Sequence, residues 1–476
     1  MRTTGVGPRG AVRAGSSGWA GDGVLGFGSR VVMPGRGEPR AQVAGVRGTI
    51  VAVDGSWWDR HHRGMGTRRM SGADDPLRLG GSELAAVREA FAGAHRCVAP
   101  AATLRRIAPL LAGCGVTRLA DLGGLDVLGV PVFQAVRPDG RAGTTTEGKG
   151  WTPDAARVSA LMEALEIWHA ERFDPPVVVG SFAELRGRLP LVDPTRLPRS
   201  PRLGLSPEQL RARSLRWVEG AALPGGEPRW VPLELVALRR YPGAAFAAHT
   251  NGLASGNHLL EAIVHGLCER IERDAHVRWT LDAAVRRVDL AGLEDPRGRA
   301  VLARLDELGA VLGAFAQTSD IGVPAYHCTL LCPAGPRQPF PAWTWGCGCH
   351  LDPTVALLRA LGEAIQVRAV FLSGRRDDLD VADYAATMDA REIELRIAEV
   401  RATPCSEAFV PRPLAPGTLQ ADLRRLVGAV EAVGGEVVVV DLTRAELGLP
   451  VVRVLTPGLE GHPHYDAPGV RTAVPR

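Results

Sequence analysis

Lysine and asparagine are almost absent from this sequence. All of its 56 basic Lys and Arg residues are Arg except Lys149, and its two Asn residues are Asn251 and Asn257. This bias is typical of a GC-rich coding sequence, which replaces Lys and Asn wherever the chemistry of a position permits. A Lys ammonium is a compact point charge whereas an Arg guanidinium is a planar fork, so the two are not interchangeable at a binding site. Lys149, Asn251 and Asn257 therefore mark positions where Arg, Asp or Ser do not serve.

Long apolar runs are also missing. No stretch approaches the roughly 20 apolar residues that cross a bilayer, and the N-terminus lacks the apolar core of a signal peptide. We therefore expect a cytoplasmic protein without a membrane partner. Its eight Cys residues are irregularly spaced, so we expect thiols rather than a framework of disulfide bonds.

The excess of basic charge is confined to the start of the chain. Residues 1–69 carry eleven Arg and four acidic residues, a charge of +7, whereas the whole chain carries +4, which leaves −3 for the remainder. Binding to nucleic acid usually requires a basic patch on the folded domain. We therefore expect no nucleic-acid partner.

The length of 476 residues exceeds what one hydrophobic core usually organises and predicts two or three packed subdomains. Residues 1–75 alternate Gly, Arg and Ser without periodicity, and we expect them to be disordered or a misassigned extension, with Met70 as the true start. We assign residues 76–476 to one functional domain. The Pro-rich segment at about 174–242 looks like an insertion within it.

Helical and strand-like patterns alternate along residues 76–476, which predicts a mixed α and β (α+β) architecture. The periodicity predicts helices from Ser82, around 104–111, and over 153–173, 257–280, 353–372 and 417–433. It predicts strands over 130–136, 325–331, 436–440 and 451–455.

Residues 143–150, GTTTEGKG, have the Gly-x-x-x-x-Gly-Lys spacing of a phosphate-binding P-loop. A P-loop needs Ser or Thr after the Lys to hold magnesium, and Gly150 stands there instead. If this segment binds a nucleotide, Lys149 supplies a point charge to a phosphate and the flanking glycines let the backbone approach closely. The magnesium ligands must then come from elsewhere in the chain.

Three of the expected helices carry an acidic stripe on an otherwise apolar surface. At 100° per residue each set falls on one face: Ser159, Glu163 and Glu166; then Asn257, Glu261, Glu269 and Glu272 with Arg273 beside them; then Arg359, Glu363 and Gln366. A single stripe is more simply explained as a solvated face, but three are more simply explained if they converge. Converging carboxylates must be neutralised, and Mg²⁺ takes oxygen ligands together with substrate phosphates.

At these residues the chain resembles the YcaO family. The resemblance spans about residues 76–465 and rests on an ordered set of segments: VPVFQAVRP (130–138), GKG (148–150), SALMEALE (159–166), NGLASGN (251–257), EAIVHGLCERIERDA (261–275), AIQVR with SGRRDD (364–378) and PVVRVLTPGLE (450–460). It implies an ATP site without a P-loop, in which acidic helices hold the nucleotide with Mg²⁺.

The resemblance also implies a role for each matching residue. Those implied to bind ATP are Lys149, Ser159, Asn257, Glu261, Glu363, Gln366 and Arg368. Those implied to hold Mg²⁺ are Glu163, Glu166, Glu261, Glu269 and Glu272, and those implied to take part in catalysis are Lys149, Glu163, Glu272 and Arg273.

The implied activity is the ATP-dependent activation of a peptide backbone amide. A nucleophile adds to the amide, the amide oxygen is phosphorylated, and it is then expelled as phosphate. A Cys, Ser or Thr side chain as nucleophile gives an azoline, and external sulfide gives a thioamide. The usual substrates are ribosomally made peptides or proteins, and members commonly form homodimers.

Two local features bear on the choice of product. Azoline-forming members commonly end in Pro-x-Pro-x-Pro, whereas this chain ends TAVPR with Pro475 alone. That difference favours thioamidation, or the branch labelled as an accessory factor for methylthiolation of ribosomal protein S12. The stretch HRCVAPAATLRRIAPLL (95–111) resembles the branch that works with a TfuA partner, expected to help deliver sulfur.

Three other interpretations compete with this one. An ordinary P-loop ATPase would use GGEVVVVDLT (434–443) as its Walker B strand, although Asp441 is better explained as a strand-end cap. A metal-binding module would use Cys328, Cys332, Cys347 and Cys349 with His327 and His350, although their spacing matches no common zinc motif and buried thiols are the simpler explanation. The third is a peptide-binding scaffold without ATP turnover, against which the intact acidic set argues.

Overall fold

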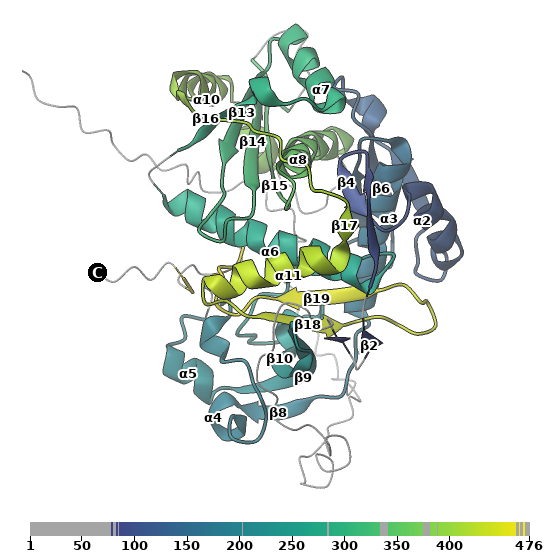
Figure 1. Ribbon diagram of the computed structural model, residues 1–476, viewed down its shortest axis with the longest axis vertical. Helices are drawn as coiled ribbons and strands as arrows, with labels where there is room; N and C mark the ends of the chain where they lie inside the picture. The colour runs from purple at the N-terminus through teal and green to yellow at the C-terminus, as the bar shows by residue number, and fades with distance from the viewer. Residues whose placement is uncertain are drawn as a thin grey trace, which may run out of the picture.

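A computed structural model describes residues 78–79, 82–83 and 85–471, except 202, 283–284, 334–340, 375–380, 388, 463–465 and 467–469. The expected extension, residues 1–75, and the terminal residues TAVPR (472–476) lie outside the described residues. Helix α6 (Leu259–Leu281) crosses the middle of the molecule, between a sheet below it and another above it (Figure 1). This mixture of helices and sheets confirms the predicted α+β class.

The lower sheet has six strands among the described residues. Its order is β10-β9-β18-β19-β11, with β8 also paired to β9, and all pairs are antiparallel. The strands are β8 (Val178–Ser181), β9 (Ser214–Leu223), β10 (Glu227–Pro232), β11 (Leu253–Ser255), β18 (Val437–Asp441) and β19 (Val451–Leu455). Helix α11 (Leu419–Ala432) packs with α6 over buried Val437, Val439, Val452 and Val454.

The Pro-rich segment 174–242 is part of this sheet rather than a separate unit. It supplies β8, β9 and β10 and the short helices α4 (Phe182–Leu185) and α5 (Pro207–Ala212). Strand β9 pairs directly with β18, more than two hundred residues later in the chain. The fully buried Trp217 on β9 lies in the main apolar cluster.

The upper sheet has the order β15-β14-β13-β12-β16. Its strands are β12 (Arg287–Asp289), β13 (Val311–Ala316), β14 (Ala325–Leu331), β15 (Trp343–Cys349) and β16 (Cys405–Ala408). Alternating residues along β13 and β14 face opposite sides, as in any strand. Helices α7 (Pro296–Glu307) and α8 (Pro353–Ser373) cover one side, and α10 (Ala390–Ala402) covers the other; α9 (Val381–Ala386) links α8 to α10.

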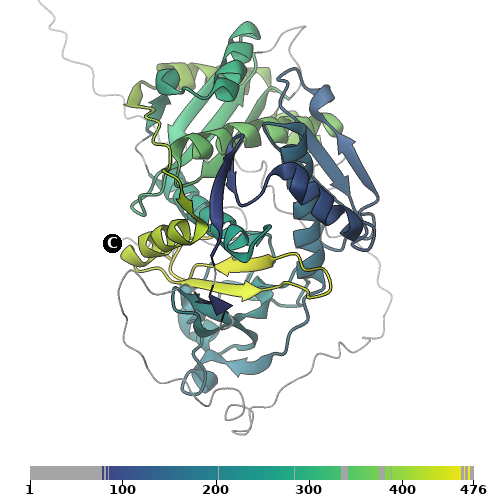
Figure 2. The same cartoon turned by 45° about the vertical axis from the view of Figure 1, so that its right-hand side comes forward.

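The smaller elements lie on the right of Figure 1. Strands β5 (Arg118–Asp121), β6 (Val132–Val136) and β7 (Thr145–Lys149) form an antiparallel sheet beside α2 (Pro100–Ile107) and α3 (Pro153–Glu171). Strands β3 (Val87–Phe91) and β4 (Ala94–Arg96) form a hairpin that β17 (Gly417–Thr418) joins, and β1 (Arg78–Leu79) pairs with β2 (Ser82–Glu83). Figure 2 brings the purple N-terminal strands to the front of the molecule.

Two helices approach their strands unusually closely, through glycine on the strand and alanine on the helix. A Cβ atom at Gly148 of β7 would lie 2.0 Å from the Ala160 nitrogen of α3, and one at Gly346 of β15 would lie 2.5 Å from the Ala364 nitrogen of α8. Only glycine allows this contact. The same arrangement therefore fixes α3 against β7 and α8 against β15.

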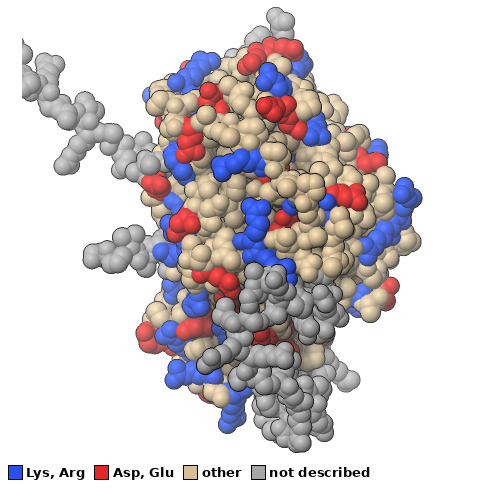
Figure 3. Space-filling view, viewed as in Figure 1, with Lys and Arg blue, Asp and Glu red and all other residues tan. Residues whose placement is uncertain are grey.

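The described part of the chain contains no helix that is long and apolar enough to span a membrane. On the face shown in Figure 3, acidic and basic side chains are both distributed over an otherwise uncharged surface.

The predicted helix from Ser82 was wrong. Residues 87–91 form strand β3, which pairs with β4 and, through Gly417 and Thr418, with a segment more than three hundred residues away. The helical spacing of Leu84, Val87 and Phe91 was coincidental, because pairing with a distant strand decided the conformation.

Candidate nucleotide and magnesium site

A cavity of about 400 Å³ opens where α3, α6 and α8 approach one another, with β7 and the β3–β4 hairpin at its edge. Seven acidic and four basic side chains line it, so acidic groups outnumber basic ones by three. They are Glu147, Glu163, Glu166, Glu261, Glu269, Glu272 and Glu363, with Arg96, Lys149, Arg273 and Arg359. Such a set of oxygen donors suits a hard cation such as Mg²⁺.

The structure brings together every residue of the predicted site except one. Ser159, Asn257 and Gln366 line the cavity together with Lys149, Arg273 and the predicted Glu residues. The three acidic stripes thus face a common space, although they come from helices separated by about a hundred residues of chain each. The convergence predicted from the sequence is therefore what the structure shows.

Arg368 is the exception. Its side chain is buried, its Nε donates to Asp126 Oδ1 at 2.9 Å, and its Nη1 donates to the Pro341 carbonyl oxygen. It is absent from the lining of the cavity. Position 368 lies two residues beyond Gln366 and so turns to another side of α8, where Arg368 holds the segment around Asp126. We therefore withdraw it from the predicted ATP contacts.

The P-loop interpretation of GTTTEGKG was wrong, because most of this segment is a strand rather than a loop. Residues 145–149 form strand β7, paired with β6 so that Glu147 faces Gln134 and Lys149 faces Val132. Glycine serves here to admit α3, as described for Gly148, and a Cβ atom at Gly150 would lie 2.4 Å from the Ala156 nitrogen. Strand alternation places Glu147 and Lys149 on the same face, which is the face that borders the cavity.

Lys149 reaches from β7 to α8. Its Nζ lies 3.5 Å from Glu363 Oε2, and its methylene chain passes over Gly362, where a Cβ atom would lie 3.2 Å from Lys149 Cδ. Gln366, one turn further, donates from Nε2 to the Glu147 carbonyl oxygen at 3.1 Å. A planar guanidinium does not replace a compact ammonium at such a position, which gives a physical reason for lysine here.

Asn257 links α2 to the start of α6. Its Oδ1 accepts a hydrogen bond from Thr103 Oγ1 at 3.0 Å, and its Nδ2 donates to Glu261 Oε1 at 3.2 Å. An Asp could accept the first bond but could not donate the second. The other oxygen of Glu261 accepts from the Cys97 backbone nitrogen at 2.8 Å and from its Sγ at 3.0 Å.

Burial and the neighbouring carboxylates shift the pKa values of several residues in this site. Burial raises the pKa of Glu166 to about 8, although the Ser255 backbone nitrogen and hydroxyl both donate to its Oε1, at 2.8 and 2.6 Å. Burial likewise raises the pKa of Glu272. Burial opposes the charge of Arg273, but the carboxylates of Glu272, Glu269 and Glu363 outweigh it and raise its pKa.

Some cationic donors of the site have no partner within the protein. The Nε atoms of Arg273 and Arg359 are buried without a hydrogen-bond partner in the described structure. Buried donors of this kind normally find an acceptor, and phosphate oxygens are strong acceptors for guanidinium groups. Together with the surplus of carboxylates, they show that the residues present fit a nucleotide with Mg²⁺.

Comparison with known proteins agrees with this geometry. A sequence profile described as YcaO cyclodehydratase, ATP- and Mg²⁺-binding, matches residues 147–460. The chain belongs to the YcaO family. ATP and Mg²⁺ are accordingly its cofactors, as the sequence predicted.

Several relatives match this chain over most of their own length. A Rhizobium leguminosarum bv. trifolii protein encoded in the tfuA 3′ region is 35% identical over 77% of this chain and 88% of its own. A Methanothermobacter thermautotrophicus protein is 34% identical over 77% of this chain and 95% of its own.

Among solved structures, YcaO from Methanopyrus kandleri bound with AMPPCP and Mg²⁺ is 26% identical, with a TM-score of 0.60 over 78% of this chain and 94% of its own. A heterocyclase in complex with substrate and cofactor has a TM-score of 0.64 at 24% identity, over 81% of this chain and 54% of its own. The latter similarity shows the fold alone.

Sequence reasoning missed several residues of this YcaO site. Glu147 was given no role, and strand alternation with Lys149 was the signal that would have found it. Arg359 was placed on the acidic face of its helix but was not chosen. His265 lines the cavity as well, and burial holds its pKa well below the ordinary value. Arg96 comes from the hairpin that no pattern predicted.

The competing interpretations can now be compared with the geometry. Asp441 is exposed at the end of β18 and accepts from the Thr443 nitrogen at 2.8 Å, as expected of a strand-end cap rather than a Walker B residue. The four Cys of the supposed metal module are all buried and form no disulfide. They do not converge: Cys332 Sγ lies 3.4 Å from Arg368 Nη1, whereas Cys347 lies beside two His residues.

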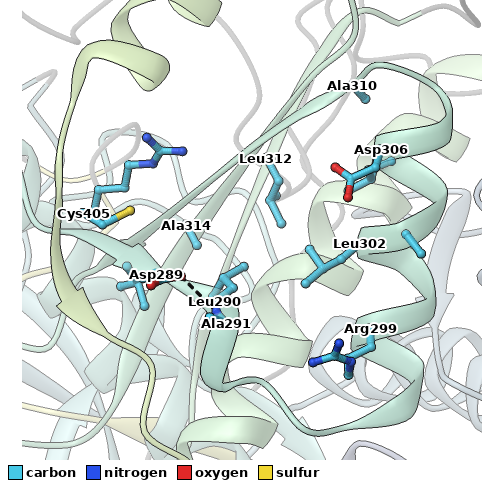
Figure 4. Close-up of a pocket in the computed structure, with 14 residues that line it drawn as sticks. Asp289, Leu290, Ala291, Arg299, Leu302, Asp306, Ala310, Leu312, Ala314 and Cys405 are labelled. Carbon is cyan, nitrogen blue, oxygen red and sulfur yellow. Dashed lines mark hydrogen bonds between the residues drawn. The ribbon is translucent and has the colours of Figure 1, made fainter.

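A second cavity, of about 480 Å³, lies between α7 and strands β12 and β13 (Figure 4). Its wall is largely apolar, with Leu290, Leu302 and Leu312, and Cys405 stands at its edge. Asp289 caps the turn that follows β12 by accepting from the Ala291 nitrogen at 2.9 Å. This cavity has no cluster of carboxylates among its lining residues and is not the nucleotide site.

Proposed function

We propose that this YcaO protein activates a backbone amide of a ribosomally made peptide or protein with ATP and Mg²⁺ and replaces the amide oxygen with sulfur. The observation that carries the proposal is the convergence of carboxylates from α3, α6, α8 and β7 on one cavity beside Lys149. Bound MgATP supplies the phosphoryl group that turns the amide oxygen, a poor leaving group, into part of a phosphate.

The carboxylates would hold the metal. We assign this role to Glu163, Glu166, Glu261, Glu269 and Glu272, which all line the cavity. Their own bonds orient them beforehand: Ser255 holds Glu166, and Asn257 with Cys97 holds Glu261. Such preorganisation avoids rearrangement of charges during the reaction.

The basic groups would meet the phosphates. Lys149 and Arg273 are held in place by acidic neighbours, with Lys149 Nζ 3.5 Å from Glu363 Oε2 and Arg273 Nη1 3.2 Å from Glu272 Oε1. Both side chains are therefore held in place at the cavity, where a fixed positive group stabilises a transferring phosphoryl group without first having to be ordered. We assign Ser159 and Gln366 to the nucleotide as polar contacts.

We favour sulfide as the nucleophile. Its sulfur would add to the amide carbon, and the former amide oxygen would leave as part of inorganic phosphate. The carbon thus exchanges one oxygen for one sulfur, and ATP is converted to ADP. The relative encoded in the tfuA 3′ region supports this choice, and on that ground we propose a TfuA-like partner that delivers the sulfur.

Azoline formation is the second candidate. The cyclodehydratase description of the family favours it, and so does the fold shared with a heterocyclase. In that case the nucleophile is a Cys, Ser or Thr side chain of the substrate peptide, and a molecule of water is lost.

Mass spectrometry separates the two products. Candidate peptides encoded near the gene are incubated with the purified protein, ATP, Mg²⁺ and sulfide. We expect exchange of oxygen for sulfur, accompanied by ATP hydrolysis that depends on the peptide. Loss of water would instead establish azoline formation, and an unchanged peptide with no stimulated hydrolysis across all candidates would contradict both.

A matched pair of variants ties the activity to the site. Glu163→Gln removes one carboxylate of the cavity, whereas Glu394→Gln removes an exposed one on α10. We expect the first to abolish ATP hydrolysis and the second to leave it unchanged. Retained hydrolysis in Glu163→Gln would count against the proposed metal site.

A further inference from the structure

A second group of metal-binding side chains lies outside the acidic cavity. His276 of α6, His327 of β14 and Cys347 of β15 are all buried, and their ligand atoms lie within 4.8 Å of one another. His327 and Cys347 are directly opposite each other in the antiparallel pair β14–β15. None of the three lines the nucleotide cavity.

We propose that these three residues bind a transition-metal ion, with Zn²⁺ as the expected occupant. Imidazole nitrogen and thiolate sulfur are the ligands that Zn²⁺ prefers in proteins. Cys347 Sγ lies 3.5 Å from His276 Nδ1 and 3.6 Å from His327 Nδ1. A tetrahedral zinc ion, with Zn–S of about 2.3 Å and Zn–N of about 2.0–2.1 Å, holds its sulfur and nitrogen ligands about 3.6 Å apart.

Hydrogen bonding explains this arrangement less well. A thiol has one proton and sulfur is a weak acceptor, yet two imidazole nitrogens face the same sulfur at similar distances, and one of them, His276 Nδ1, also lies 2.8 Å from Gln317 Nε2. A metal ion at the centre satisfies all three side chains at once.

Gln317, which follows β13, lies beside the three side chains. It is 2% exposed, its amide Nε2 lies 2.8 Å from His276 Nδ1, and its Oε1 has no hydrogen-bond partner in the described structure. The oxygen and nitrogen of an amide are interchangeable by half a turn of the group. That turn directs the orphan Oε1 at the three side chains, where it can serve as the fourth ligand.

The surroundings suit a closed structural site. The rings of Trp345 and Trp279 stack on His276 and His327, with centroids 5.0 to 6.0 Å apart. This aromatic wall leaves little room for a substrate. Zinc sites that serve structure have all four positions filled by the protein, whereas catalytic ones keep one open.

The position of the cluster indicates a structural role for the ion. Gly346 lies on one face of β15 and packs against α8 at Glu363. Cys347 lies on the other face and contacts His276 of α6. His276 follows Glu272 by one helical turn. A zinc ion here would fasten α6 to β15 and so fix the two walls of the acidic cavity, Glu272 with Arg273 on one side and Glu363 on the other.

Metal analysis of the protein as purified, without chelators, tests the proposal. We expect an equimolar amount of zinc in the native chain and its loss in Cys347→Ala. Cys328→Ala is the matched control, because Cys328 is an equally buried thiol on the neighbouring strand that faces the opposite side, and we expect it to keep its zinc. Equal zinc in the two variants would overturn the assignment.

Cobalt spectroscopy on the native chain needs no substitution, so its result does not depend on whether a variant folds. After zinc is exchanged for Co²⁺, we expect visible bands of a tetrahedral ion and a thiolate-to-cobalt charge-transfer band. A milder variant, His327→Gln, should shift or weaken these bands. Cobalt that binds without the charge-transfer band, or a native chain that takes up neither zinc nor cobalt, would refute the site.

Discussion

Lys149 Nζ lies 3.5 Å from Glu363 Oε2, so the single lysine of the chain joins β7 to α8 at the edge of the acidic cavity. Strand β7 is thereby held between two helices, with Gly148 against α3 and Lys149 against α8. A charge fixed in this way can meet a phosphate without first having to be ordered.

Replacement of Lys149 by methionine should slow ATP hydrolysis by about 10²–10³-fold, the usual cost of one preorganised donor to a developing charge. Lys149→Arg should also lose activity, because a planar guanidinium does not replace a compact ammonium beside a phosphate. Steady-state kinetics with saturating ATP measure both. Arg118→Met, on the exposed edge of β5, is the control for loss of a charge, and full activity of Lys149→Arg would contradict the argument from shape.

Binding of ATP with Mg²⁺ should stabilise the folded protein. The carboxylates of the cavity carry an excess of negative charge, which the metal relieves, and a ligand at a hundred times its Kd adds about 2.7 kcal/mol. Thermal unfolding should therefore show a higher Tm with both ligands than with ATP and EDTA. Glu166→Gln should reduce this increase, and an increase that does not depend on Mg²⁺ would contradict the metal assignment.

Gly148→Ala should destabilise the protein by about 1–3 kcal/mol or more, the usual cost of overpacking. The added Cβ atom would lie 2.0 Å from the Ala160 nitrogen, which belongs to the backbone and cannot move aside alone. Gly428→Ala is the control: it lies in helix α11 with nothing within 4 Å of the new atom, and alanine should stabilise that helix by about 1 kcal/mol. Thermal unfolding of the pair measures the difference, and equal Tm values would show that α3 and β7 are not in close contact.

Arg368→Ala should affect stability rather than nucleotide binding. Arg368 and Asp126 form a buried ion pair at 2.9 Å, with side chains 1% and 4% exposed. Removal of one partner of such a pair typically costs about 3–5 kcal/mol. We expect a lower Tm and an unchanged Kd for ATP at a temperature where the variant is folded. A weaker Kd at unchanged Tm would restore Arg368 to the site.

The helices that carry the site could be predicted because their information is local. Apolar periodicity marked α3, α6 and α8, and their observed bounds differ from the predicted ones by only a few residues. The acidic stripes followed from the same periodicity. Their convergence could be argued only from the physical cost of leaving so many carboxylates without a counter-ion.

The rest depended on contacts between distant parts of the chain. Strand β3 exists because β17 pairs with it, and no pattern around Val87 contains that partner. The place of Arg368 depends on Asp126, and that of His276 on His327 and Cys347. Glu147 is different: its position was predictable from strand alternation, but the resemblance of the segment to a P-loop concealed the strand.

The most direct test of the account is a crystal structure with a non-hydrolysable ATP analogue and Mn²⁺, located by its anomalous scattering. We predict manganese at the carboxylates of α3 and α6, among them Glu163, Glu166 and Glu272, with the phosphates beside Lys149. Nucleotide bound elsewhere, such as in the cavity of Figure 4, with the acidic cavity free of manganese, would contradict it.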